Sequence, residues 1–119
     1  MGWLFRKKPA ASGTAAMDSM VLGQLHKAGS DLAQPHEVDN FLYFPDETTA
    51  RLAADRLRTS SNTVDVAPGA KGRDWCLKAV VVVIPTPQNI AEMRARMEAV
   101  AHSLKGHYDG WGAPIVPKP

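Results

Sequence analysis

Residues 75–90 read WCLKAVVVVIPTPQNI and place a long apolar segment directly before a helix start. The run from 79 to 84 is apolar at every position, so both of its faces are expected to be buried, as in a strand at the centre of a sheet. Thr86 and Pro87 follow, and a threonine N-cap with proline at the first helical position is a typical start of a helix. This stretch therefore predicts a central strand followed by a helix.

Downstream of this stretch, the pattern predicts a helix of about four turns and a last strand. Gly106 is expected to end the helix, and residues 107–111 are expected to form the strand. The buried face of the helix is marked by apolar residues at helical spacing, namely Ile90, Met93, Met97, Val100, Ala101 and Leu104.

Upstream, the order of strand and helix occurs once more. Residues 36–44 predict a strand that Pro45 ends, and Asp46 is placed to cap a helix. Residues 63–67 predict a short strand, which a glycine-containing hairpin loop joins to the central strand. The helix between these strands has a stripe of small and apolar residues, Ala50, Ala53, Ala54 and Leu57.

The order of these elements is β-α-β-β-α-β. Right-handed crossovers put both helices on one face of a four-stranded antiparallel sheet, so we expect an α+β, ferredoxin-like two-layer sandwich. An extra N-terminal helix precedes it, with Met17, Met20, Val21, Leu25 and Ala28 at helical spacing. The predicted organisation is a basic flexible tail at 1–16, one domain at 17–113 and a C-terminal tail at 114–119.

The net charge of +2 is unevenly distributed. Arg6, Lys7 and Lys8 are the charged residues of segment 1–16, so the rest of the chain carries −1 once these three charges are taken from +2. A nucleic-acid-binding domain usually gathers lysine and arginine on one face, so this balance argues against direct nucleic-acid binding. No apolar run approaches the roughly 20 residues of a transmembrane helix. One cysteine fits a reducing compartment, and we expect a cytoplasmic protein.

The residue types of catalytic and metal sites form no recognisable pattern. Cys76 lies within a predicted strand, where a free cysteine is usually a small core residue. The chain contains no glycine-rich phosphate loop followed by a helix. The histidines occur on different predicted elements without metal-ligand spacing; they are His26, His36, His102 and His107. We therefore expect no enzyme, no catalytic residue, no metal and no cofactor.

One face of the predicted sheet is open unless something covers it. Phe41 and Tyr43 share one face of their strand, and Leu42 and Phe44 share the other. Whichever pair points outward exposes aromatic side chains, and such a patch often marks an interaction site. The alternative is that the first helix or a second copy of the chain covers it, so a homodimer is possible.

Three stretches carry a resemblance to a known family. Residues 31–45 contain Glu37-Val38 and the run FLYFP, residues 85–90 read PTPQNI, and residues 106–111 read GHYDGW. In this order they resemble the RraB family, regulators of ribonuclease activity known as inhibitors of the endoribonuclease RNase E. The resemblance extends from about residue 17 to residue 113, which defines an RraB-like domain.

The resemblance implies a ferredoxin-like fold and a non-catalytic bacterial regulator of RNA metabolism that binds an RNase E-type ribonuclease or its assembly. Phe41, Tyr43, Asp109 and Trp111 are the predicted partner-binding residues. Asp109-Gly110 is a candidate bulge that aims Trp111; alternatively, Tyr108 and Trp111 are core anchors. Two other functions stay open: RNA binding by the basic tail and open-face aromatics, and self-association of unassigned role.

Overall fold

The computed structural model describes residues 15–70, 72 and 74–119, so most of the predicted basic tail lies outside the described residues. Helices and strands follow one another in the predicted order. They are α1 (Ala15–Lys27), β1 (His36–Phe44), α2 (Glu47–Leu57), the 3₁₀ turn η1 (Arg58–Ser60), β2 (Thr63–Pro68), β3 (Trp75–Val83), α3 (Pro87–Ser103) and β4 (His107–Gly112).

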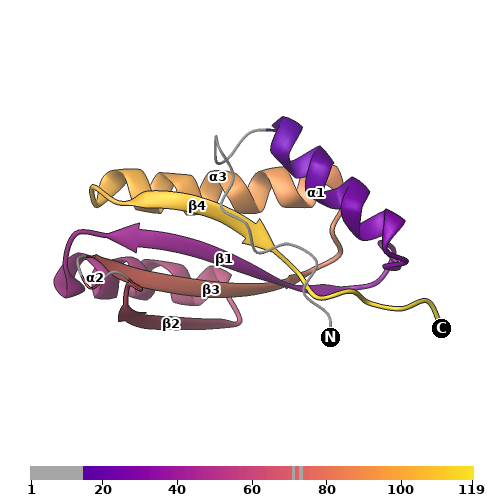
Figure 1. The fold of residues 1–119 in the computed structure, drawn as a ribbon. Coiled ribbons are helices and arrows are strands. Elements are labelled where there is room, and N and C mark those ends of the chain that lie inside the picture. The colour runs from indigo at the N-terminus through magenta and orange to yellow at the C-terminus, as the bar shows by residue number, and fades with distance from the viewer. Residues whose placement is uncertain (1–14, 71, 73) are drawn as a thin grey trace.

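The four strands form one antiparallel sheet in the order β2-β3-β1-β4. The apolar strand β3 lies inside the sheet, as predicted. Helix α2 packs on β2 and β3, helix α3 packs on β4 and β1, and the two helices contact each other on one side of the sheet (Figure 1). The predicted α+β two-layer arrangement with an added N-terminal helix is therefore confirmed.

The alternating burial of the β1 side chains shows which face of the sheet the helices cover. Val38, Leu42 and Phe44 are buried beneath the helices, whereas Phe41 and Tyr43 are half-buried on the opposite face. Successive side chains of a strand point to opposite faces, so β1 contributes to both the core and the outer surface. The aromatic pair on the open side is Phe41 with Tyr43.

Both predicted helix caps are confirmed. The backbone N–H of Thr49 donates to Oδ1 of Asp46 over 2.8 Å, and the N–H of Asn89 donates to Oγ1 of Thr86 over 3.0 Å. Each cap provides an acceptor for an N–H group that has no partner within the first turn.

Helix α3 ends differently from the prediction at Gly106. Its last helical residue is Ser103, and Lys105 adopts the left-handed conformation with φ 61°. The N–H of Gly106 bonds to the carbonyl of Ala101 over 2.7 Å and closes the helix end. Gly106 itself is required by space, because an added Cβ would lie 2.4 Å from Cε1 of Phe44.

The core lies between the sheet and the helices, and the predicted stripe of α2 is fully buried. The prediction for α1 was partly wrong. Met20 is 46% exposed and Ala28 is exposed, whereas Asp18 and Leu22 are buried. Helix α1 packs across α3 beside the end of β4 (Figure 1), which rotates the buried stripe away from Met20.

Part of the predicted C-terminal tail is tied to the loop after α1. The N–H of Asp31 donates to the carbonyl of Val116, and the N–H of Val116 donates to Oγ of Ser30 over 2.9 Å. His36 Nδ1 lies 2.8 Å from the carbonyl of Gln34 and therefore carries the proton. The Ser30 hydroxyl thus donates to His36 Nε2 over 2.6 Å and links the tail to β1.

Candidate partner-binding surface

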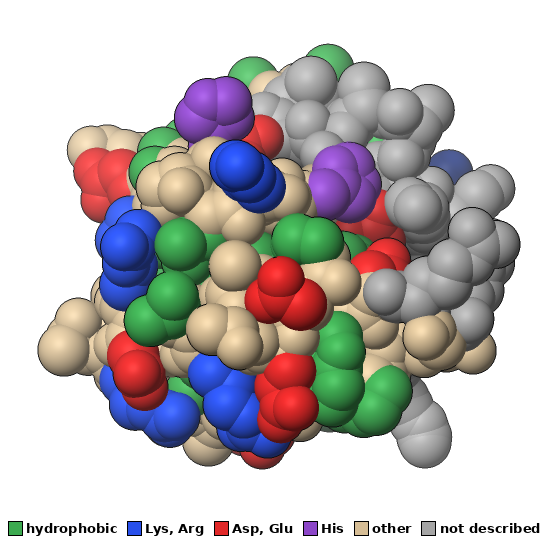
Figure 2. Space-filling model, turned by 90° about the vertical axis from the view of Figure 1, so that its left-hand side faces the viewer, with side chains coloured by type: hydrophobic (Ala, Val, Ile, Leu, Met, Phe, Trp, Pro, Cys, Tyr) green, Lys and Arg blue, Asp and Glu red, His purple; other side chains and the backbone are tan. Residues whose placement is uncertain are grey.

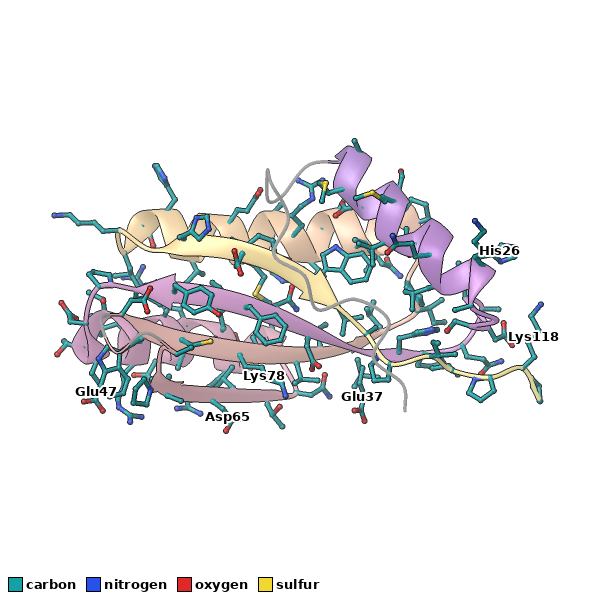
Figure 3. The ribbon with its side chains drawn as sticks, viewed as in Figure 1. His26, Glu37, Glu47, Asp65, Lys78 and Lys118 are labelled. Carbon is teal, nitrogen blue, oxygen red and sulfur yellow. The ribbon has the colours of Figure 1, made fainter. Side chains whose placement is uncertain are left out.

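The open sheet face consists of strand side chains that point away from α2 and α3. Glu37, Asp65 and Lys78 come from β1, β2 and β3 and lie on the side of the sheet turned away from α3 (Figure 3). The cross-strand register places the remaining members beside them. The whole set is Glu37, Asp39, Phe41, Tyr43, Thr63, Asp65, Ala67, Cys76, Lys78, Val80, Val82, His107 and Asp109.

The centre of this face is apolar and aromatic. Phe41 lies opposite Lys78, and Tyr43 lies opposite Cys76. Along β3 the apolar surface continues through Val80 to Val82, which is 45% exposed. An exposed apolar strip of this kind is typical of an interaction surface.

Acidic residues surround this apolar strip. Five carboxylates occupy the open face or its edge, whereas Lys78 is the one lysine or arginine among its described side chains. The five carboxylates are those of Glu37 and Asp39 on β1, Asp65 on β2, Asp74 just before β3 and Asp109 on β4. His107 Nε2 lies 3.5 Å from Oδ1 of Asp109 and forms an ion pair only when protonated. Asp39 is buried, and the exposed carboxylates of Glu37 and Asp65 make the rim of this face complementary to a cationic ligand.

Tyr43 and Cys76 form a protonated pair at neutral pH. Burial, and then the neighbouring thiol of Cys76, raise the pKa of Tyr43 to about 12. Burial also raises the pKa of Cys76, and the neighbouring hydroxyl of Tyr43 opposes that shift. The carboxylates of Asp74 and Asp109 act in the same direction as burial on both groups. The pair offers hydrogen-bonding groups to a ligand, while a thiolate nucleophile is disfavoured.

A β-bulge controls the direction of the β4 side chains. Phe41 lies opposite Gly110 and Leu42 lies opposite Tyr108, so Asp109 is the extra residue. Gly110 has φ 117°, a conformation that glycine adopts most readily. The predicted bulge is confirmed, and it places Tyr108 and Trp111 on the same, helix-covered face although they are three residues apart.

Trp111 does not lie on the open sheet face. It is 4% exposed, and its Nε1 donates to Oδ1 of Asp18 over 3.0 Å. The other carboxylate oxygen of Asp18 accepts a 2.8 Å hydrogen bond from Nε of Arg94, so Trp111 joins β4 to α1 and α3. Of the four predicted binding residues, the structure brings together Phe41, Tyr43 and Asp109 and separates Trp111 from them.

The acidic residues around the aromatic centre, apart from Asp109, were not among the predicted site residues. Their signal was present on β1, where Glu37 and Asp39 share the parity of Phe41 and Tyr43. Asp65 alternates with the apolar residues of β2 in the same way. No local pattern connects the carboxylates of β1, β2 and β4, because these strands are brought together only by their pairing in the sheet.

A shallow depression lies between α3 and β4, away from the centre of the open sheet face. This shallow groove of about 540 Å³ is bordered by Glu98, His102 and His107, with Ala95 and Ala99 on its helix side. Figure 2 views the end of the molecule where β4 begins and shows two histidine side chains there, with basic and acidic side chains intermixed below them. This mixed surface shows no charge preference comparable with that of the open sheet face.

The described part of the chain contains neither a metal-ligand cluster nor a membrane-spanning helix. No group of three or more histidine, cysteine, aspartate or glutamate side chains among residues 15–70, 72 and 74–119 is arranged to hold a metal ion. No helix in these ranges is long and apolar enough to cross a membrane.

Comparison with protein families gives one match. The model of RraB, the regulator of ribonuclease activity B, matches residues 15–113, from the start of α1 to just beyond β4. The chain belongs to the RraB family. Comparison with individual curated proteins gives no match. Membership of RraB links the chain with the regulation of ribonuclease activity.

Proposed function

We propose that this RraB family member is a non-catalytic regulator that binds a ribonuclease of the RNase E type, or its assembly, through the open sheet face. Family membership supports the link to ribonuclease regulation. The observation that carries the binding surface is the aromatic centre, Phe41 and Tyr43, among carboxylates from three strands. We propose that Asp109 takes part from the edge strand.

The charge of this face favours a basic protein segment as its ligand. Proteins that handle RNA bind phosphates through lysine and arginine. Carboxylates such as Glu37 and Asp65 attract such residues and repel RNA itself. A regulator of this chemistry occupies the basic surface of a ribonuclease and so competes with its RNA substrate.

The decisive experiment measures binding to the purified ribonuclease of the same organism by calorimetry. Phe41→Ala and Tyr43→Ala are each expected to raise the Kd by about 10-fold, because a buried aromatic hot spot contributes about 1–2 kcal/mol or more. Leu52→Ala is the matched control, since Leu52 is 45% exposed on α2, away from the open sheet face. Unchanged Kd values for folded Phe41 and Tyr43 variants contradict the proposed surface.

A parallel measurement separates protein binding from RNA binding. The ribonuclease should cleave a model RNA more slowly when the regulator is added, and the regulator alone should not bind that RNA. Binding of RNA alone with an affinity that falls steeply with salt favours the RNA-binding alternative instead.

A further inference from the structure

The segment that precedes α1 has an unusual composition. Residues 1–14 lie outside the described residues, and their sequence is known. Trp3, Leu4 and Phe5 are followed directly by the three cations Arg6, Lys7 and Lys8, and no acidic residue occurs before Asp18. The segment thus combines a short apolar cluster with three positive charges.

The open sheet face offers the complementary chemistry. Its apolar strip of Phe41, Val80 and Val82 matches the apolar cluster, and its excess of carboxylates matches the cations. Glu37 and Asp65 are both exposed at its rim. Complementary charge and apolar surface are the two features that make a short segment dock at a specific face.

The chain can reach this face. Asp18, in the first turn of α1, bonds to Trp111 of β4, so the segment leaves the domain beside the edge strand. Because α1 lies with the helices on the covered side of the sheet, the segment first passes around the edge strand β4, a layer spacing of about 10 Å, and crossing from β4 over β1 to β3 requires about 10 Å more. The seven residues from Lys8 to Ala15 span up to about 23 Å when extended. Residues 3–8 therefore reach β1 and β3 when this linker is nearly extended.

We propose that residues 3–8 dock on the open sheet face of their own chain, with the apolar cluster over the Phe41–Val80 strip and the cations beside Glu37 and Asp65. Attachment through a short linker gives an effective concentration in the millimolar range, so even a weak contact is populated. The docked segment excludes other ligands from the face. This competition with the ribonuclease rests on the proposed function, whereas the docking itself does not.

Cys76 provides a direct reporter of this docking. It is the single cysteine of the chain and lies on the open sheet face opposite Tyr43. In the full-length protein, its alkylation by the uncharged reagent iodoacetamide is followed by mass spectrometry at low salt. The variant Arg6→Glu/Lys7→Glu/Lys8→Glu is expected to react at least five-fold faster than the unchanged protein, because repulsion releases the segment. Salt at about 0.5 M is expected to speed the alkylation of Cys76 in the unchanged protein, because it screens exposed charges and so weakens the docking.

The matched control reverses three charges away from this face, Lys27→Glu/Arg96→Glu/Lys118→Glu, and should react at the rate of the unchanged protein. A charge swap adds specificity: Glu37→Lys/Asp65→Lys, combined with the reversed segment, should restore slow alkylation. Equal rates for the unchanged protein and the segment variant, or a rise in rate that the control variant shares, overturn the proposal. Neither result bears on ribonuclease binding, which the Phe41 and Tyr43 variants test separately.

Docking also predicts the size of its effect on a partner. If the segment covers the face ten times more often than it leaves it free, the apparent Kd of a competing ligand is about 10-fold higher than that of the free face. The probe is a synthetic peptide with the sequence of residues 1–14, added to the segment variant. Slower alkylation of Cys76 in its presence supports the proposed site, and an unchanged rate at millimolar peptide counts against it.

Discussion

The two faces of the sheet differ in what they bury and in the charge of their polar groups. On β1, Val38 and Leu42 are inaccessible beneath the helices, whereas Phe41 and Tyr43 on the other face are half-buried. The same nine-residue strand therefore supplies core contacts at one parity and the proposed binding surface at the other. The comparison separates residues that hold the fold together from residues that are available to a partner.

Polar groups on the covered face are individually satisfied. Asn40 is fully buried, donates to the carbonyl of Ala79 over 3.2 Å, and accepts a 2.8 Å hydrogen bond from the hydroxyl of Tyr108. The open face instead gathers carboxylates of one sign. Like charges at close range oppose folding, so their concentration points to a requirement for binding and not for stability.

The largest expected difference between the faces is in stability. Leu42→Ala is expected to lower the free energy of unfolding by about 2–5 kcal/mol, because it opens a cavity in the core. Phe41→Ala, one position away, is expected to cost less than half as much, since Phe41 is only half-buried. Urea denaturation of both variants measures the difference. Equal losses would show that the open face is as tightly packed as the core.

A smaller loss is expected where α1 meets the covered face. Asp18→Ala leaves the Arg94 guanidinium and the Trp111 indole N–H without their shared acceptor, and is expected to cost about 3 kcal/mol. Trp111→Phe keeps most of the ring and removes one hydrogen bond, so about 1 kcal/mol is expected. Denaturation gives both values. Neither change should alter partner binding if Trp111 acts only in the core.

The two tyrosines report on the two faces by their ionisation. Tyr43 has its pKa raised to about 12, and burial raises the pKa of Tyr108 well above its ordinary value. Both are ordinary tyrosines when unfolded, with pKa near 10. Stability from both raised pKa values is thus fully present below pH 10. The contribution of Tyr43 to stability is lost as the pH rises towards 12, and the contribution of Tyr108 is lost at still higher pH.

Ultraviolet absorption at about 295 nm measures this titration, since tyrosinate absorbs there. In Tyr43→Phe, no tyrosine should ionise before the protein unfolds. In the unchanged protein, one reversible step near pH 12 should precede unfolding. Ionisation of both tyrosines near pH 10 in the folded protein would contradict the described burial.

The smallest effect is expected at the turn that leads into β4. Lys105 and Gly29 occupy equivalent left-handed positions at the ends of α3 and α1, with φ 61° and 93°. Lys105→Gly relieves the strain of a side chain in this conformation, and is expected to raise the unfolding free energy by about 0.5–1 kcal/mol. Gly29→Ala is expected to lower it by about 1 kcal/mol. Thermal unfolding measures both, and stabilisation by Gly29→Ala would contradict this account.

Local residue patterns were sufficient to predict the helices and strands and their order. Asp46 and Thr86 marked helix starts because their side chains accept backbone hydrogen bonds locally. The uninterrupted apolar run of β3 marked a strand buried on both faces. Each of these signals depends on residues that are close in the chain, and a local pattern is sufficient to read them.

The membership of the candidate surface followed from the bulge and from the pairing of distant strands, which no local residue pattern reveals. One extra residue, Asp109, reversed the parity of β4 and turned Trp111 into the core, where Asp18 of α1 receives its indole N–H. The register between strands, and not any local run, gathered Glu37, Asp65 and Asp109 on one face. A strand's alternation fixes the relation between its own side chains, but a bulge and the pairing of distant strands decide which face each of them joins.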